Sequence, residues 1–233
     1  MSIHRRHFLR LAALSACVPA LHAEDEPEPA AEDIQRLVKL SYIRQDMSLK
    51  GVLRNDATDA ETPFNLAMQD NTIRFRFDNP AQIVNLDLND KGFTLYEVTK
   101  GSKAEIKPGR YTEKIRGTDM TYEDLSLRFL YWPNPVKLEN ETVSHRTCWR
   151  LRLSNPGGSG AYGTAFLWVD KGSGGLLQMQ GYDRQGKLIK QYKVISGMKV
   201  GNGMMLKEMR IESFDPSNSK KVVGRTYLEL EKP

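Results

Sequence analysis

The chain has 233 residues, of which 39% are hydrophobic and 27% charged, and its formal net charge is +5 at pH 7. Three of the 34 basic residues lie in the first 23 positions, which hold no acid, so the rest of the chain carries 31 basic and 29 acidic residues, a net charge of +2. Such a small net charge gives no electrostatic reason to expect a nucleic-acid partner. About 210 residues suit a single domain.

Residues 1–23 have the pattern of a secretory signal peptide: a basic start, a short apolar run and small residues before Ala23. Arg5 and Arg6, followed by Phe8-Leu9-Arg10, resemble the bacterial twin-arginine export signal, so these two arginines are the expected recognition residues. The apolar run is far shorter than the roughly 20 residues of a membrane-spanning helix. The pattern predicts export to the periplasm.

The cleavage site has two readings. Cleavage after Ala23 would release a protein without an anchor, whereas Leu14-Ser15-Ala16-Cys17 fits a lipobox, after which Cys17 would be acylated and hold the protein at a membrane. Cleavage before Cys17 leaves an apolar run below the roughly 7 to 15 residues that such signals use. We therefore favour Ala23.

Residues 24–31 are acidic and contain proline, which predicts a flexible leader. A single domain is expected over 32–233. It opens with an amphipathic helix, because Ile34, Val38 and Tyr42 recur at helical spacing from Glu32 onward.

From Met47 the apolar period changes to two, as in Ile73-Arg74-Phe75-Arg76-Phe77. Turn signals recur every 8 to 12 residues without crossover helices, which predicts antiparallel pairing. The predicted strands are 49–54, 63–69, 73–77, 83–88, 93–98, 148–153, 162–170, 176–183, 188–200, 204–214 and 222–231. The expected fold is α+β and mainly β, with about 10 to 11 strands curling toward a barrel.

One segment, 121–132, interrupts the strands. Thr121 and Asp124 form a variant of the capping box, and the apolar residues after them predict a short helix that Pro133 ends. Such an apolar helix either plugs one end of the barrel or forms a lid over an apolar cavity.

A family resemblance rests on several stretches of the second half. These are Tyr122-Glu123-Asp124-Leu125, Phe129-Leu130-Tyr131-Trp132-Pro133, Phe166-Leu167-Trp168-Val169-Asp170-Lys171, Tyr182 to Lys190 and Val200-Gly201-Asn202-Gly203-Met204. They resemble the outer membrane lipoprotein-sorting proteins of the LolA/LolB-like superfamily, and most closely its uncharacterised LolA-like branch. The resemblance covers about residues 110–215 and implies an incomplete antiparallel barrel wrapped around one or two helices, with an apolar cavity for acyl chains.

The resemblance therefore implies a carrier of lipid or lipoprotein acyl chains in the cell envelope. The expected cavity residues are Phe75, Phe77, Leu86, Leu125, Phe129, Trp132, Phe166 and Trp168. An alternative is an envelope scaffold that uses the same half-barrel to hold a protein partner, by pairing at its open edge. We expect a monomer in either case.

No catalytic residues are predicted. After cleavage at Ala23 the only histidine is His145 and the only cysteine is Cys148, and their spacing of three puts them on opposite faces of a strand. A hydrolase triad would lack its base. We expect neither an enzyme, nor a cofactor, nor a metal site, and we expect Cys148 to be a small core residue.

Overall fold

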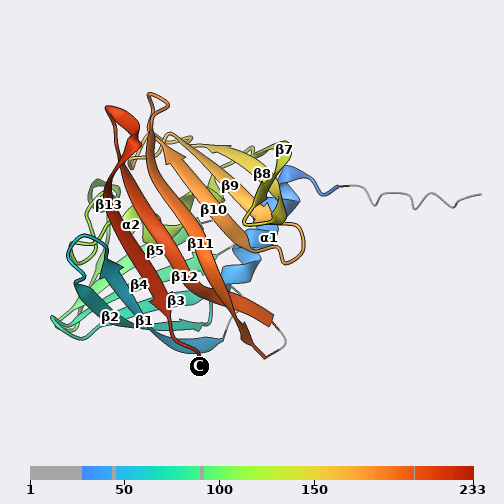
Figure 1. The fold of residues 1–233 in the computed structure, drawn as a ribbon. Helices are drawn as coiled ribbons and strands as arrows, with labels where there is room; N and C mark the ends of the chain where they lie inside the picture. The colour runs from blue at the N-terminus through green and yellow to red at the C-terminus, as the bar shows by residue number, and fades with distance from the viewer. Residues whose placement is uncertain (1–27, 44–45, 90–91, 202) are drawn as a thin grey trace, which may run out of the picture.

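The computed structural model describes residues 28–43, 46–89, 92–201 and 203–233. It contains one antiparallel sheet of thirteen strands and two α-helices, with two 3₁₀ turns (Figure 1). The helices are α1 (Ala31–Ile43) and α2 (Tyr122–Ser126), and the 3₁₀ turns are η1 (Pro108–Arg110) and η2 (Arg128–Tyr131). The strands are β1 (Met47–Asn55), β2 (Glu61–Gln69), β3 (Thr72–Phe77), β4 (Gln82–Asn89), β5 (Gly92–Thr99), β6 (Ser102–Glu105), β7 (Val136–Val143), β8 (Arg146–Ser154), β9 (Thr164–Asp170), β10 (Leu176–Tyr182), β11 (Leu188–Val200), β12 (Gly203–Asp215) and β13 (Asn218–Leu230).

Two meanders make up the sheet. Strands β1 to β6 pair in sequence, strands β7 to β13 do the same, and β13 joins the meanders by pairing with β1 in the register Leu53 to Leu228. The end strands β6 and β7 are not paired with each other. The sheet is therefore an open, LolA-like half-barrel, as predicted, and it wraps around α1 and α2 (Figure 1).

The sheet has thirteen strands where the sequence indicated 10 to 11. The two additional strands, β6 and β7, are the two edges of the sheet. All four residues of β6 are exposed, and most of β7 is exposed or half-buried, so neither strand has a sustained apolar alternation. Edge strands commonly carry charged residues because these discourage pairing with other chains.

The concave face of the sheet holds the core. Alternation in β3 buries Ile73, Phe75 and Phe77 on this face and leaves Arg74 and Arg76 on the other. Helix α1 adds Ile34 and Val38, both buried. One hydrophobic cluster connects these side chains, so the domain has its main core between the sheet and the segments that lie inside it.

Contacts of Glu28 hold the chain before α1 to the edge of the sheet. Its carboxylate accepts hydrogen bonds from Lys137 Nζ at 3.2 Å and Asn140 Nδ2 at 3.1 Å, both on β7, and also from Lys171. The hydrogen bond from Lys171 is the largest cause of a Glu28 pKa of about 2. The described end of the predicted leader thus contacts the domain beside β7.

Candidate functional site

The candidate site is the concave interior of the half-barrel, and its β1–β5 side is apolar. The ring of Phe64 lies 5.5 Å from that of Phe75 and 6.0 Å from that of Phe77, centroid to centroid. Val84 and Leu86 of β4 are fully buried beside them. This arrangement follows from the alternation of β2, β3 and β4, and we call it the aromatic side.

Residues 106–135, which connect β6 to β7, cover this interior, and we call them the covering segment. Its buried apolar side chains are Ile106, Tyr111, Ile115, Met120, Tyr122, Leu125, Phe129, Leu130 and Trp132. They belong to the same cluster as the aromatic side. Helix α1 is tied to the segment because Gln35 Nε2 donates a hydrogen bond to the Trp132 carbonyl at 2.9 Å. The barrel is thus covered by short, irregular chain, not by a second sheet.

The capping box predicted at Thr121 is present. The Asp124 amide donates to Thr121 Oγ1 at 3.2 Å, and the Thr121 amide donates to Asp124 Oδ2 at 2.8 Å. The helix predicted over 121–132 is shorter than expected, since α2 ends before Leu127, whose φ of 48° is left-handed, and η2 follows. Because the chain changes direction at Leu127, both α2 and η2 keep apolar residues inside the barrel.

A buried polar cluster forms the other side of the interior. The hydroxyls of Tyr162 and Tyr192 both donate to Asp124 Oδ1, and Lys190 Nζ lies 3.3 Å from Asp124 Oδ2. The whole-residue exposures of Tyr162, Tyr192 and Lys190 are 2%, 5% and 7%. Burial first, and the Asp124 charge second, raise the pKa of both tyrosines well above 10. The phenols therefore stay protonated and can donate.

Asp119 extends this cluster toward β12 and β13. Its carboxylate accepts from Lys114 Nζ at 3.0 Å and from Ser213 Oγ at 3.3 Å, and its amide donates to Thr226 Oγ1 at 2.9 Å. Its carbonyl accepts from Lys190 Nζ. We call Asp119, Asp124, Tyr162, Lys190, Tyr192, Ser213 and Thr226 the polar cluster.

Two glycines make room for the cluster. A Cβ at Gly181 would lie 2.6 Å from the Tyr162 ring, and a Cβ at Gly224 would lie 2.1 Å from Asp119 Oδ1. Atoms cannot approach so closely, so a side chain at either position would displace Tyr162 or Asp119. These glycines position the polar cluster by their lack of a side chain.

Glu123, next to Asp124, makes a separate buried contact. Its carboxylate accepts from the Ala161 amide at 2.6 Å and from Arg128 Nη1 at 3.4 Å. Burial raises the pKa of the Glu123 carboxyl. This contact joins α2 to the loop before β9, so the two consecutive acids of the covering segment both bind the barrel.

Six of the eight residues predicted to line the cavity lie together inside the barrel. They are Phe75, Phe77, Leu86, Leu125, Phe129 and Trp132, all buried members of the main core cluster. The first three belong to the sheet and the last three to the covering segment. The structure thus buries these six side chains in one cluster.

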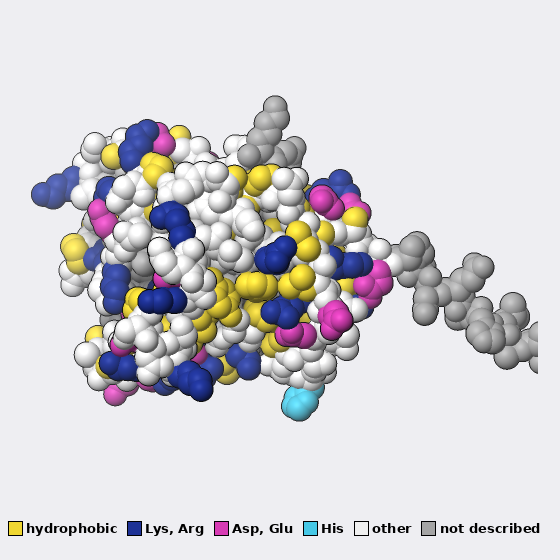
Figure 2. Space-filling view, turned by 90° about the horizontal axis from the view of Figure 1, so that it is seen from above, with side chains coloured by type: hydrophobic (Ala, Val, Ile, Leu, Met, Phe, Trp, Pro, Cys, Tyr) yellow, Lys and Arg dark blue, Asp and Glu magenta, His cyan; other side chains and the backbone are white. Residues whose placement is uncertain are grey.

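The prediction was wrong for Phe166 and Trp168. Ala165, Leu167 and Val169 of β9 belong to the main core, so the alternating Phe166 and Trp168 lie on the outer face, in a second cluster with Cys148. There the Arg150 guanidinium stacks on both rings, at 5.1 and 5.2 Å from their centroids. Figure 2 shows hydrophobic side chains bordered by Lys and Arg on the surface seen from above.

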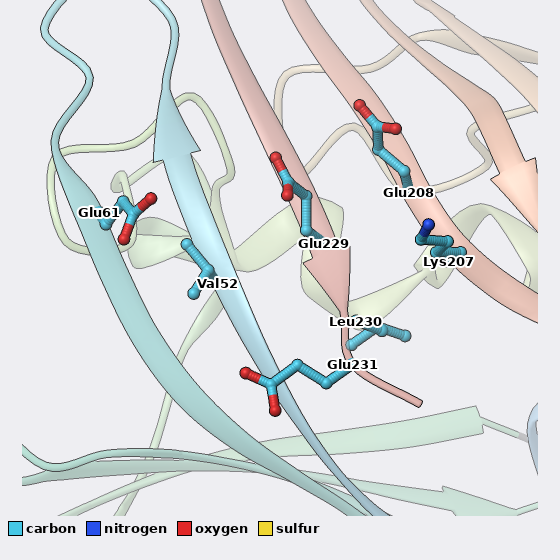
Figure 3. Close-up of a pocket in the computed structure, with 7 residues that line it drawn as sticks. All are labelled: Val52, Glu61, Lys207, Glu208, Glu229, Leu230 and Glu231. Atoms are coloured by element: carbon cyan, nitrogen blue, oxygen red, sulfur yellow. The ribbon is translucent and has the colours of Figure 1, made fainter. Parts of the chain in front are cut away.

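Two shallow hollows lie outside the barrel. One, of about 280 Å³, is lined by Val52, Glu61, Lys207, Glu208, Glu229, Leu230 and Glu231 (Figure 3). The other, of about 260 Å³, is lined by Asp56, Ala57, Val222, Val223, Gly224 and Arg225. Neither contains a predicted cavity residue. The buried side chains of the covering segment and the aromatic side belong to one hydrophobic cluster.

Other predicted residues have simpler placements. Cys148 is a free thiol buried in the second cluster, and burial raises its pKa. Within the described residues, no group of His, Cys, Asp and Glu has the geometry to hold a metal ion, and no helix is long and apolar enough to cross a membrane. Arg5, Arg6 and Cys17 lie outside the described residues.

A model for a family described as uncharacterised proteins matches residues 89–232, more than half of the chain. The chain belongs to this family. No curated protein gives a significant match.

Solved structures agree on the fold. The chain is similar to an outer membrane lipoprotein-sorting protein domain from Vibrio parahaemolyticus, with a TM-score of 0.67, 14% identity and coverage of 87% of this chain and 90% of that one. It is also similar to a LolA superfamily protein from Nitrosomonas europaea, with a TM-score of 0.64, 15% identity and coverage of 88% and 93%. A third similar structure is a DUF1329 family protein from Desulfovibrio piger, with a TM-score of 0.61, 14% identity and coverage of 87% of this chain and 91% of that one. At these identities the similarity establishes the LolA-like fold.

Proposed function

We propose that this chain is a non-catalytic periplasmic carrier that binds lipid or lipoprotein acyl chains inside its half-barrel, for transport or sorting in the cell envelope. The observation that carries the proposal is the apolar concave face, closed only by α1 and the covering segment. The fold shared with a lipoprotein-sorting domain supports it.

Loading requires the covering segment to move. The side chains of Leu125, Phe129 and Trp132 are buried in the same hydrophobic cluster as the aromatic side. Acyl chains could replace these contacts with little net change in buried apolar area, because burial energy depends mainly on area. The segment would then act as a lid, which is one of the two readings of 121–132.

The test is the variant Phe129→Ala. A carrier loses bound lipid in this variant while the domain stays folded, because the Phe129 side chain of the lid would contact the bound acyl chains. Native mass spectrometry of protein purified from the envelope measures the lipid, and thermal unfolding of the same sample measures stability. Phe166→Ala is the matched control, since it removes the same atoms from the outer face and should keep the lipid.

Two outcomes would contradict the carrier. One is the absence of lipid from the wild-type protein. The other is a steep loss of stability in Phe129→Ala with unchanged lipid per folded molecule, since burial of Phe129 in a packed core alone accounts for about 3 to 5 kcal/mol.

Export is part of the proposal and is tested separately. Changing Arg5 and Arg6 to Lys should leave precursor in the cytoplasm, whereas normal accumulation in the periplasm would point to the general secretory route. The mass of the mature protein should correspond to a start at Glu24. A mass that includes an acylated Cys17 would instead give a membrane-anchored carrier.

The second candidate function is an envelope scaffold. The observation in its favour is β7, an eight-residue edge strand with no strand partner on its outer side among the described residues. An extended peptide could add to this edge through backbone hydrogen bonds. A stoichiometric protein partner and no lipid in native mass spectrometry would favour the scaffold.

A further inference from the structure

Three hydrogen-bond donors of the barrel converge on one carboxylate. Tyr192 and Lys190 lie on the inner face of β11, two residues apart, and Tyr162 precedes β9. The Tyr162 and Tyr192 hydroxyl oxygens are 3.3 Å apart and both contact Asp124 Oδ1, while the Lys190 ammonium faces Asp124 Oδ2. A cation with two neutral donors is a suitable environment for an anionic oxygen.

The donors and the acceptor belong to different parts of the molecule. All three donors are on the barrel, whereas Asp124 and the Asp119 carbonyl, which also accepts from Lys190, are on the covering segment. Of the contacts of Lys190, only the one with Ser213 Oγ, at 3.0 Å, remains within the sheet. Withdrawal of the segment would therefore leave the donors without their anion.

Such a vacancy would be unfavourable in an apolar interior. A buried donor without an acceptor costs about 1 to 3 kcal/mol, and a buried charge without its counter-ion costs more. Buried ion pairs also contribute little net stability compared with apolar packing, so closure of the lid alone gives no reason to keep one. A ligand that brings its own anionic oxygen would satisfy the donors in the open state.

We propose that Tyr162, Lys190 and Tyr192 bind the anionic headgroup of the carried lipid, and that Asp124 occupies this headgroup site in the closed state. The inference rests on the proposed carrier function and adds the ligand class: an amphiphile with a carboxylate or phosphate beside its acyl chains. Tyr162 and Tyr192 belong to the same core cluster as Phe75 and Phe77, so headgroup and chains would occupy one continuous interior.

The test compares two lipids that have the same acyl chains, of which only one carries an anionic phosphate. Delipidated protein is titrated with dioleoyl phosphatidic acid and with dioleoylglycerol, and binding is measured by native mass spectrometry. We expect the wild-type protein to prefer the anionic lipid by about tenfold or more. Lys190→Gln and Tyr192→Phe should reduce this preference severalfold and leave dioleoylglycerol binding unchanged.

We expect Asp124→Asn to have the opposite effect on binding of the anionic lipid. The amide keeps the shape of the side chain but loses its charge, so it competes less well for Lys190, and binding of the anionic lipid should become severalfold tighter. Lys199→Gln is the matched control, because Lys199 is an exposed lysine on the same strand. Thermal unfolding is measured for every variant, and if Lys190→Gln does not fold, Tyr192→Phe and Asp124→Asn decide.

Each result has one meaning. Equal binding of both lipids, unchanged in all three variants, would overturn the headgroup site and leave the carrier intact. Binding of neither lipid to the wild-type protein would overturn the carrier itself. Inorganic phosphate is titrated in a separate arm, and if it alone abolishes the charge preference at the concentration of the lipid, the site takes a free anion and the headgroup assignment fails.

Discussion

The two sides of the barrel interior use different chemistry to hold the same covering segment. The aromatic side offers Phe64, Phe75 and Phe77, which require only shape and area from what they contact. The polar cluster requires an acceptor at one place, because the Lys190 ammonium and two phenols point at one carboxylate. Under the proposed carrier function, the aromatic side would contact the acyl chains and the polar cluster would select for charge.

The largest predicted effect comes from the polar cluster. Asp124→Ala removes the counter-ion of Lys190 and the capping box together, and should lower the free energy of unfolding by about 4 to 6 kcal/mol. Adding Lys190→Met should recover part of this loss, because no unpaired charge remains. Denaturant unfolding of both single variants and the double variant measures the coupling. If the losses of unfolding free energy in the two single variants simply added up in the double variant, Asp124 and Lys190 would not be coupled and the prediction would be contradicted.

The next prediction concerns the aromatic side. Phe77→Ala should cost about 3 to 5 kcal/mol, while Phe77→Leu should cost less than about 1.5 kcal/mol because it leaves much less empty volume. Phe166 is half-buried on the outer face, so Phe166→Ala should lower the free energy of unfolding by less than Phe77→Ala does. A larger loss for Phe166→Ala in thermal unfolding would contradict the assignment of these two phenylalanines to opposite faces.

The smallest predicted effect distinguishes the two sides by pH. Folding raises the pKa of Tyr162 and Tyr192, so their contribution is complete below the unfolded value of about 10 and is lost as pH rises above it. Stability should therefore fall above pH 10. In Tyr192→Phe the fall should be shallower by about 1 kcal/mol at pH 11. Thermal unfolding between pH 8 and 11 measures it, and parallel curves would contradict the prediction.

Much of the fold could be predicted from alternation and turn signals. All eleven predicted strands are present, because each buries a face and so shows a period of two. The edges β6 and β7 were missed since their composition is largely polar. Phe166 and Trp168 were assigned to the wrong face because β9 has apolar residues on both faces. The alternation of side chains along such a strand does not indicate which face is inside.

The polar cluster was beyond prediction from local patterns. Thr121 and Asp124 gave a correct capping box, but Tyr162 and Tyr192 are 38 and 68 residues from Asp124 and meet it only through the fold. One signal was present: Lys190 and Tyr192 are two residues apart in a predicted strand and so share a face. A lysine on an inner face requires a buried partner.

The contact of Glu28 with β7 determines how long a tether the domain would have. With its pKa near 2, the Glu28 carboxylate stays ionised, and the contact kept, at ordinary pH. A mature chain that starts at Glu24 has four residues before this point, whereas one that starts at Cys17 has eleven. Eleven extended residues reach about 36 to 40 Å. An acylated form would therefore keep its β7 edge within about one bilayer thickness of the membrane surface.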